Sequence, residues 1–151
     1  PVDDATDQTE KYFWAAPFEI DGEFGGLESP SGGSYAMSFK RPELFPLEDR
    51  ANTTIGIIAT DADLTKAQAQ RLATSAHDGI ARAIVPSHLP FDGDLIFATT
   101  TSEIPLQDEV YDFAEICHAA SLCMARAIAR GVYNAENLPG DPMPTYKKLN
   151  G

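Results

Sequence analysis

Two apolar, β-branched runs after residue 52 constrain this fold more than any other feature of the chain. The runs at 54–60 (TIGIIAT) and 95–101 (LIFATTT) have the length and composition of buried strands. Each is followed by a stretch with helical periodicity. The order strand, helix, strand, helix predicts an α/β fold.

The two helices have clear boundary signals. Thr65 and Gln68 form the T-x-x-Q pattern of a capping box, with Leu64 placed as a hydrophobic staple, and Pro86 ends the helix that they open. The second helix is expected from about 108 to 130, a stretch without Gly or Pro, with Gly131 as its C-cap. Both carry an apolar stripe suited to covering a sheet.

Composition divides the chain into residues 1–52, rich in Gly, Pro and acidic side chains, and residues 53–151. In the first part, 12–20 is expected to form an edge or interrupted strand because of Pro17, and 35–39 another short strand. The tail 137–151 is expected to be irregular. Two strands are too few for a stable sheet, so residues 1–52 complete it or its partner strands lie on another polypeptide.

Charge and hydropathy exclude two classes of partner. The formal charge of −12 argues against nucleic acid, which cationic patches bind, and no apolar run reaches the roughly 20 residues of a membrane span. Cys117 and Cys123 lie six apart on the expected helix, about 120° from facing each other, so we interpret both as small buried core residues without a disulfide. This is compatible with a reducing compartment and favours the cytoplasm.

Common hydrolase and nucleotide-binding motifs are absent from the sequence: there is no G-x-S-x-G, H-E-x-x-H, C-x-x-C, Walker A or G-x-G-x-x-G after a strand. His77, His88 and His118 lack metal-ligand spacing, and we interpret them as packed or surface residues. This interpretation is weakest for His88, which lies in a Pro-flanked loop beside two aspartates.

Asn52 and Thr53 stand at the junction between the loop-rich part and the first strand. A Thr hydroxyl becomes a good nucleophile when Thr is N-terminal, because its own α-amine then serves as the base. Cleavage of the Asn52–Thr53 bond, by attack of Thr53 Oγ1 on the Asn52 carbonyl, would create that arrangement. From the residues alone, the sequence Asn-Thr-Thr before a strand is more commonly a simple turn.

Asp92 and Asp94 flank Gly93 directly before the second strand. Two aspartates on a loop can bind a divalent cation, or can orient a base and hold an ammonium group. They can also be solvated carboxylates of a turn in which Gly93 adopts a positive φ. The residues alone leave these three interpretations open.

Several elements in order carry a family resemblance: NTT opening a strand, the strand end ATDA, the helix start LTKAQ, then AHDG and DGD, with PFEIDGEFGG upstream. Together they resemble the L-aminopeptidase/D-amino-acid esterase (DmpA-type) family of self-cleaving N-terminal nucleophile-like hydrolases. That family includes β-peptidyl aminopeptidases and NylC-like nylon-oligomer hydrolases. The Asn-Thr and DGD pattern is closer to the NylC-like members.

The resemblance implies roles for individual residues. Thr53 matches the nucleophile, Asn52 the residue before the scissile bond, and Asp92 and Asp94 the polar pair that assists the nucleophile. It implies an αββα sandwich of the DmpA/ornithine acetyltransferase type, of which this chain is the C-terminal half. The boundary at 52–53 then separates the end of an α-subunit segment from a β-subunit segment, within one domain.

The resemblance also implies partners. We expect a small peptide or amide substrate, no metal or other cofactor, the N-terminal part of the same precursor, and a homo-oligomer. The oxyanion donors, a lysine or tyrosine and an asparagine, are expected upstream of Pro1. An exo-acting aminopeptidase is the favoured activity; endo-acting hydrolysis of amide oligomers and a non-catalytic interaction domain are the alternatives.

Overall fold

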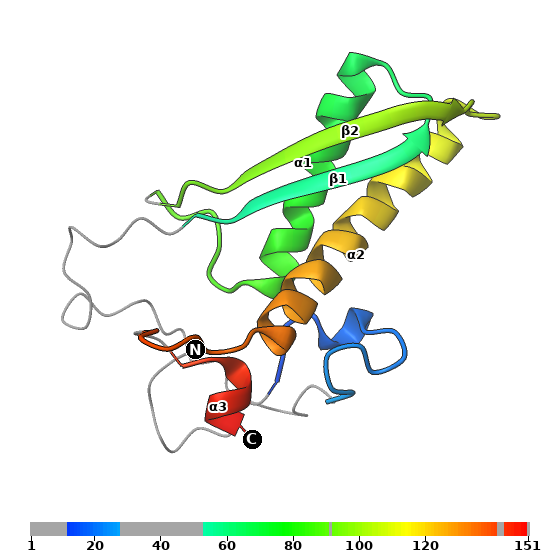
Figure 1. The fold of residues 1–151 in the computed structure, drawn as a ribbon. Helices are drawn as coiled ribbons and strands as arrows, with labels where there is room; N and C mark the ends of the chain where they lie inside the picture. Colours follow the sequence, from blue (N-terminus) through cyan, green and yellow to red (C-terminus); the bar gives the residue numbers. More distant parts are fainter. Residues whose placement is uncertain (1–11, 28–52, 91, 142–143, 151) are drawn as a thin grey trace.

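The structure, a computed structural model, describes residues 12–27, 53–90, 92–141 and 144–150. It has the mixed α/β character expected from the sequence (Figure 1). The elements in chain order are the 3₁₀ turn η2 (Ala16–Phe18), β1 (Ile55–Ala62), α1 (Lys66–Ala83), β2 (Leu95–Ile104), α2 (Tyr111–Asn134) and α3 (Tyr146–Asn150).

The sheet consists of β1 and β2, paired in parallel, among the residues that the structure describes. Ile55 lies opposite Leu95 at the start of both strands, and the register is regular as far as Thr60. Helix α1 makes the crossover that two parallel strands require. The pairing therefore brings the residues that precede the two strands to the same edge of the sheet.

Helix α1 begins where the sequence predicts. The Thr65 hydroxyl accepts a hydrogen bond from the Gln68 backbone, and the Gln68 side chain accepts one from the Thr65 backbone at 2.9 Å. Leu64, placed before this capping box, is buried in the main core. These contacts satisfy N–H groups that a helix start otherwise leaves without partners.

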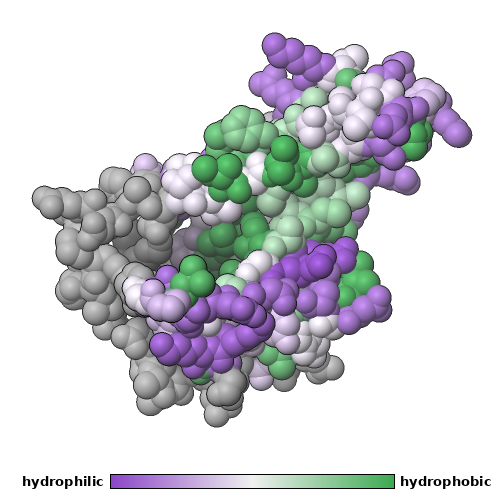
Figure 2. Space-filling view, viewed as in Figure 1, coloured by the Kyte–Doolittle hydropathy of each residue, from purple (hydrophilic) through white to green (hydrophobic). Residues whose placement is uncertain are grey.

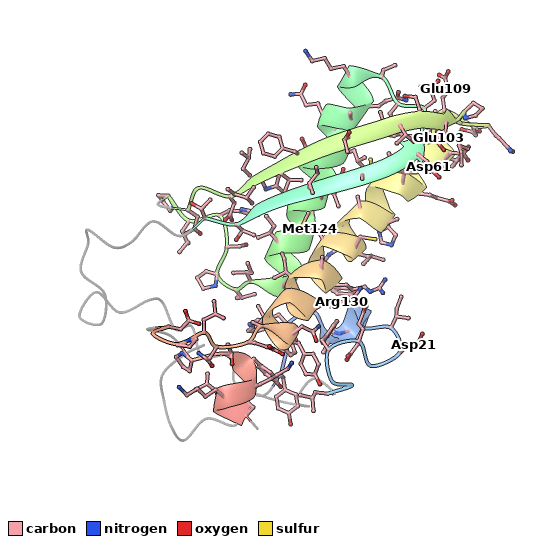
Figure 3. All side chains as sticks on the ribbon, in the orientation of Figure 1. Asp21, Asp61, Glu103, Glu109, Met124 and Arg130 are labelled. Atoms are coloured by element: carbon pink, nitrogen blue, oxygen red, sulfur yellow. The ribbon has the colours of Figure 1, made fainter. Side chains whose placement is uncertain are left out.

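Helices α1 and α2 pack against each other and cover one face of the sheet (Figure 1). Glycine allows the close approach, since a Cβ at Gly79 would lie 2.3 Å from the Ser121 carbonyl oxygen. Met124, labelled in Figure 3, fills the space beside Gly56 of β1. The buried side chains of this core are Ala62, Leu64, Leu72, Ala76, Ile80, Ile96, Ala120 and Met124.

The other face of the sheet is apolar and exposed. The alternate residues Ile55 and Ile57 of β1 are 69% and 66% exposed, and Phe97 of β2 is 55% exposed. Figure 2 shows hydrophobic residues gathered over the two strands. The sequence predicts strands buried on both faces; in the described part of the chain, one face of each strand is covered.

The expected strand at 12–20 is wrong: this segment forms the 3₁₀ turn η2, with Pro17 at its start. Its aromatic residues instead pack against the second half of α2. Phe24 is buried with Ala125, and the Glu23 carboxylate accepts hydrogen bonds from the Arg126 guanidinium. Tertiary packing on α2 thus decides the conformation of this β-prone segment.

Helix α2 runs through Gly131 to Asn134, so the predicted C-cap at Gly131 is wrong. The extra turn carries Tyr133, whose ring contacts Phe13 and Tyr146, and this packing favours a longer helix. The predicted irregular tail contains the short helix α3. The predicted strand at 35–39 lies outside the described residues.

Cys117 and Cys123 form no disulfide, as expected. The prediction that both are buried is wrong, because Cys117 is half-buried and Cys123 is exposed. Cys123 lies on the side of α2 that faces a groove beside β1 rather than the α1 contact. In the described part of the chain, none of the helices is long and apolar enough to cross a membrane.

Candidate active site

The two sequence motifs meet at the amino ends of β1 and β2. Thr53 and Thr54 precede β1, and Asp92, Gly93 and Asp94 precede β2. The Leu95 N–H donates to the Thr54 carbonyl at 2.9 Å, which continues the ladder to this edge. Figure 3 shows the acidic residues Asp61, Glu103 and Glu109 at the opposite end of the sheet.

Asp94 binds the backbone next to the candidate nucleophile. The Thr54 N–H donates to Asp94 Oδ1 at 3.0 Å, and the Asp94 side chain is only 8% exposed. Burial works to raise the pKa of this carboxyl, but hydrogen bonds from Thr54 and the charge and N–H of His88 outweigh it. The pKa therefore lies below its ordinary value, and Asp94 is a carboxylate at neutral pH.

Thr53 lies directly against Gly93. A Cβ added to Gly93 would stand 2.7 Å from Thr53 Oγ1, closer than side chains ordinarily approach. Gly93 does not have a positive φ, so the turn geometry considered from the sequence does not explain this glycine. Glycine is needed here because the Thr53 hydroxyl occupies the space of a side chain, while Thr53 itself stays exposed.

Asp92 has a different environment from Asp94. Its Oδ2 accepts the Leu89 N–H at 2.8 Å, and its own N–H donates to the Leu89 carbonyl at 2.8 Å. These two bonds close the turn that leads into β2. Asp92 thus shapes the loop that carries Gly93 and Asp94.

His88 is a site residue that sequence reasoning did not select. Its Nδ1 lies 2.9 Å from Asp94 Oδ2, and its Nε2 lies 3.3 Å from the carbonyl oxygen of His77. The sequence signal was its position between Pro86 and Pro90, close to the aspartates. His77 lies on α1 beside it, with the two rings 5.3 Å apart, whereas His118 lies on α2, where its carbonyl accepts the Ser121 hydroxyl.

Thr53, Asp92 and Asp94 therefore come from two loops and lie at one edge of the sheet, while Asn52 lies outside the described residues. Within the described ranges, no three His, Cys, Asp or Glu side chains are grouped as ligands for a metal ion. The groups at this site that can take part in a reaction are the exposed Thr53 hydroxyl, the Asp94 carboxylate and the His88 imidazole.

The site thus combines the exposed Thr53 hydroxyl, which lies against Gly93, with the buried Asp94 carboxylate, which binds the Thr54 N–H. The model of peptidase family S58 matches residues 6–144 and so includes this whole site. The chain belongs to peptidase family S58.

Named relatives of this S58 chain fall into two groups. The first comprises proteins described as uncharacterised aminopeptidases: that of Mycobacterium bovis is 36% identical over 146 residues, covering 90% of this chain and 41% of the relative. That of Mycobacterium leprae is 43% identical over 105 residues, covering 63% of this chain and 28% of the relative.

The second group is named for another activity. A 6-aminohexanoate-oligomer endohydrolase of Paenarthrobacter ureafaciens is 38% identical over 61 residues, which cover 40% of this chain and 17% of that protein. The S58 chain thus spans about two fifths of the length of the Mycobacterium bovis relative, and less of the other two proteins.

Proposed function

We propose that this chain carries the nucleophile of a self-processing amide hydrolase, with Thr53 as the nucleophile after cleavage of the Asn52–Thr53 bond. The observation that supports it is the position of the exposed Thr53 hydroxyl against Gly93. The next residue, Thr54, is held through its backbone N–H by the Asp94 carboxylate. Membership of a peptidase family supports the reaction class.

Self-cleavage begins with attack of Thr53 Oγ1 on the Asn52 carbonyl carbon. The C–N bond breaks as the C–O bond forms, the hydroxyl proton passes to the departing nitrogen, and the product is an ester with a free Thr53 amine. Water then hydrolyses the ester, which releases the Asn52 carboxylate and restores the hydroxyl. The new α-amine has an ordinary pKa near 8, suited to general base work at neutral pH.

Turnover uses the same groups. The α-amine takes the Thr53 hydroxyl proton as Oγ1 attacks the substrate carbonyl, and it returns that proton to the leaving amine. Water hydrolyses the resulting ester. Asp94, which binds the Thr54 N–H, holds the N-terminal residue in register with the Gly93 loop, and Asp92 keeps that loop closed.

The exposed apolar face of the sheet supports the proposal that the fold is one half of an αββα sandwich. Ile55, Ile57 and Phe97 together leave more apolar surface open than scattered surface residues do. We propose that the preceding part of the same polypeptide covers this face and supplies the oxyanion donors. Homo-oligomer formation belongs to the same proposal.

The two groups of relatives support different substrates. Aminopeptidase names favour removal of an N-terminal residue, and the endohydrolase name favours internal cleavage of amide oligomers. The Asp94 carboxylate, which binds the N–H of the residue after Thr53, favours the first, since a carboxylate suits a substrate ammonium group. Free-amine and N-acetylated substrates separate the two, because an aminopeptidase loses activity on blocked substrates.

The test of the nucleophile uses Thr53→Val, which matches the shape without the hydroxyl, and Thr53→Ser, which keeps it. In protein expressed from the complete coding sequence, mass spectrometry should find a fragment that begins at residue 53 in the wild type and in Thr53→Ser. Thr53→Val should stay intact and lose activity by roughly a thousandfold or more. An intact wild-type chain, or an active Thr53→Val, would favour the non-catalytic interaction domain.

A further inference from the structure

The His88 ring lies between two oxygen acceptors. Nδ1 faces the Asp94 carboxylate at 2.9 Å, and Nε2 faces the His77 carbonyl at 3.3 Å. A carboxylate and a carbonyl can only accept hydrogen bonds, so a ring nitrogen of His88 that carries a proton donates to the oxygen that it faces. The ring is thus held at two points between α1 and the start of β2.

The backbone at His88 is also unusual. Its φ is +56°, in the left-handed region that only a few per cent of non-glycine residues adopt, among which Asn, Asp and His are the most frequent. Such conformations persist where surrounding contacts hold them, and they occur often at functional sites. This conformation, together with the two ring contacts, places the imidazole over the Asp94 carboxylate.

Asp94 is shared between two partners. Oδ1 accepts the Thr54 N–H and Oδ2 faces His88, so the orientation that serves Thr54 is also the one that His88 holds. Without a donor at Oδ2, the carboxylate would be free to rotate about its χ angles and would lose part of its charge compensation in a site where it is 8% exposed.

We propose that His88 is a positioning residue of the hydrolase: it fixes the Asp94 carboxylate, which in turn holds the Thr53–Thr54 backbone where the N-terminal nucleophile must act. This inference rests on the proposed function of Thr53. His88 does not touch the substrate in this scheme, so its loss should lower kcat more than it changes KM.

The test compares three substitutions that all tolerate a left-handed backbone. His88→Asn keeps a donor near the position of Nδ1, His88→Asp has the same shape but offers only acceptors, and His88→Gly removes the side chain. The measurements are kcat and KM on a chromogenic amino-acid anilide, per chain cleaved at Asn52–Thr53, with protein from the complete coding sequence. Thermal unfolding provides the check on folding.

We expect His88→Asp and His88→Gly to lower kcat by about tenfold or more, with KM within about twofold, and His88→Asn to keep most of the wild-type kcat. Because the His88 side chain is 38% exposed, added imidazole should restore part of the kcat of His88→Gly in a saturable way. Should His88→Gly fail to fold, the Asn and Asp variants still compare, in one shape, a neutral donor with a charged acceptor beside Asp94.

Equal kcat values for His88→Asn and His88→Asp would overturn the inference, as would a wild-type kcat in His88→Gly. The Thr53→Val variant separates this result from a failure of the proposed function. If Thr53→Val is inactive while His88→Gly is fully active, only the role of His88 is wrong. If Thr53→Val is fully active, the proposed function itself is wrong.

Discussion

The Thr54 N–H donates to Asp94 Oδ1 at 3.0 Å and joins residues that are 40 positions apart in the chain. This hydrogen bond lies just before Ile55 and Leu95, the first pair of the parallel ladder. Parallel strands present their amino ends at one edge, so two loops that each precede a strand must meet there. The bond ties the residue that follows the candidate nucleophile to the Asp94 carboxylate.

Asp94→Asn should make the protein less stable at neutral pH. The folded-state pKa of Asp94 is lowered because hydrogen bonds from Thr54 and the charge of His88 outweigh its burial. Such a group contributes stability above its unfolded pKa of about 4, and the contribution is lost as pH falls through the lower folded value. Urea unfolding of the wild type and of Asp94→Asn, at about ten pH values between about pH 2 and pH 7, measures both effects.

The wild type should therefore lose more stability than Asp94→Asn as the pH falls below about 4. Asp63→Asn serves as the control, because Asp63 is exposed and lies beyond the other end of β1. If the free energy of unfolding fell equally with pH in the wild type and in Asp94→Asn, the prediction would be contradicted.

Gly93→Ala should reduce activity with little effect on folding. The added methyl would lie 2.7 Å from Thr53 Oγ1, so the hydroxyl must turn away or the loop must shift. A displacement of the nucleophile by about 1 Å can lower kcat by as much as a hundredfold. Steady-state kinetics and the extent of cleavage at Asn52–Thr53 report the change; wild-type values for both would show that the loop adapts.

Gly79→Ala and Gly131→Ala should have opposite effects on stability. A Cβ at Gly79 would meet the Ser121 carbonyl oxygen at 2.3 Å, where α1 and α2 are in contact, which predicts a loss of about 1–3 kcal/mol. Gly131 is an exposed position of α2, and no atom lies within 4 Å of a Cβ added there. Alanine should therefore raise the free energy of unfolding by about 0.5–1 kcal/mol, because it restricts the unfolded chain.

Chemical denaturation of the two glycine variants checks these signs, and each variant is the other's control for the same Gly→Ala change. Destabilisation by Gly131→Ala would show that this last part of α2 is not helical in solution.

Cys123 reports on whether the groove beside β1 is covered in the complete protein. In the described part of the chain, β1 pairs only with β2, and its other edge borders a groove that Cys123, Met124, Ala127 and Ile128 line. If a preceding part of the polypeptide packs there, as proposed above, Cys123 should react with iodoacetamide at least about tenfold more slowly in the native protein than in denaturant.

Peptide mapping by mass spectrometry assigns the modified cysteine, and Cys123→Ser is the control for the assignment. Native and denatured rates that agree would contradict coverage of this groove. Protection that disappears on dilution would point to a second copy of the protein rather than to the same chain.

Local patterns were sufficient for most of the secondary structure. The capping box of Thr65 and Gln68 predicts the start of α1, and the β-branched runs predict β1 and β2. These patterns work because contacts between residues close in sequence decide such elements. The predictions of a strand at 12–20 and of a helix end at Gly131 were wrong for the opposite reason, since packing on α2, through Phe13 and Tyr133, overrides the local preference.

The sequence by itself determined which residues could do chemistry: Asn52 and Thr53 before one strand, and Asp92 and Asp94 before the next. It carried no measure of their distance, because the separation of two loops depends on whether their strands pair and in which direction. Only the tertiary structure decided that Asp94, rather than Asp92, binds the backbone beside Thr53, and that Gly93 makes room for the hydroxyl. His88 joined the site for the same reason, since a ring contact across a folded loop has no periodicity in the sequence.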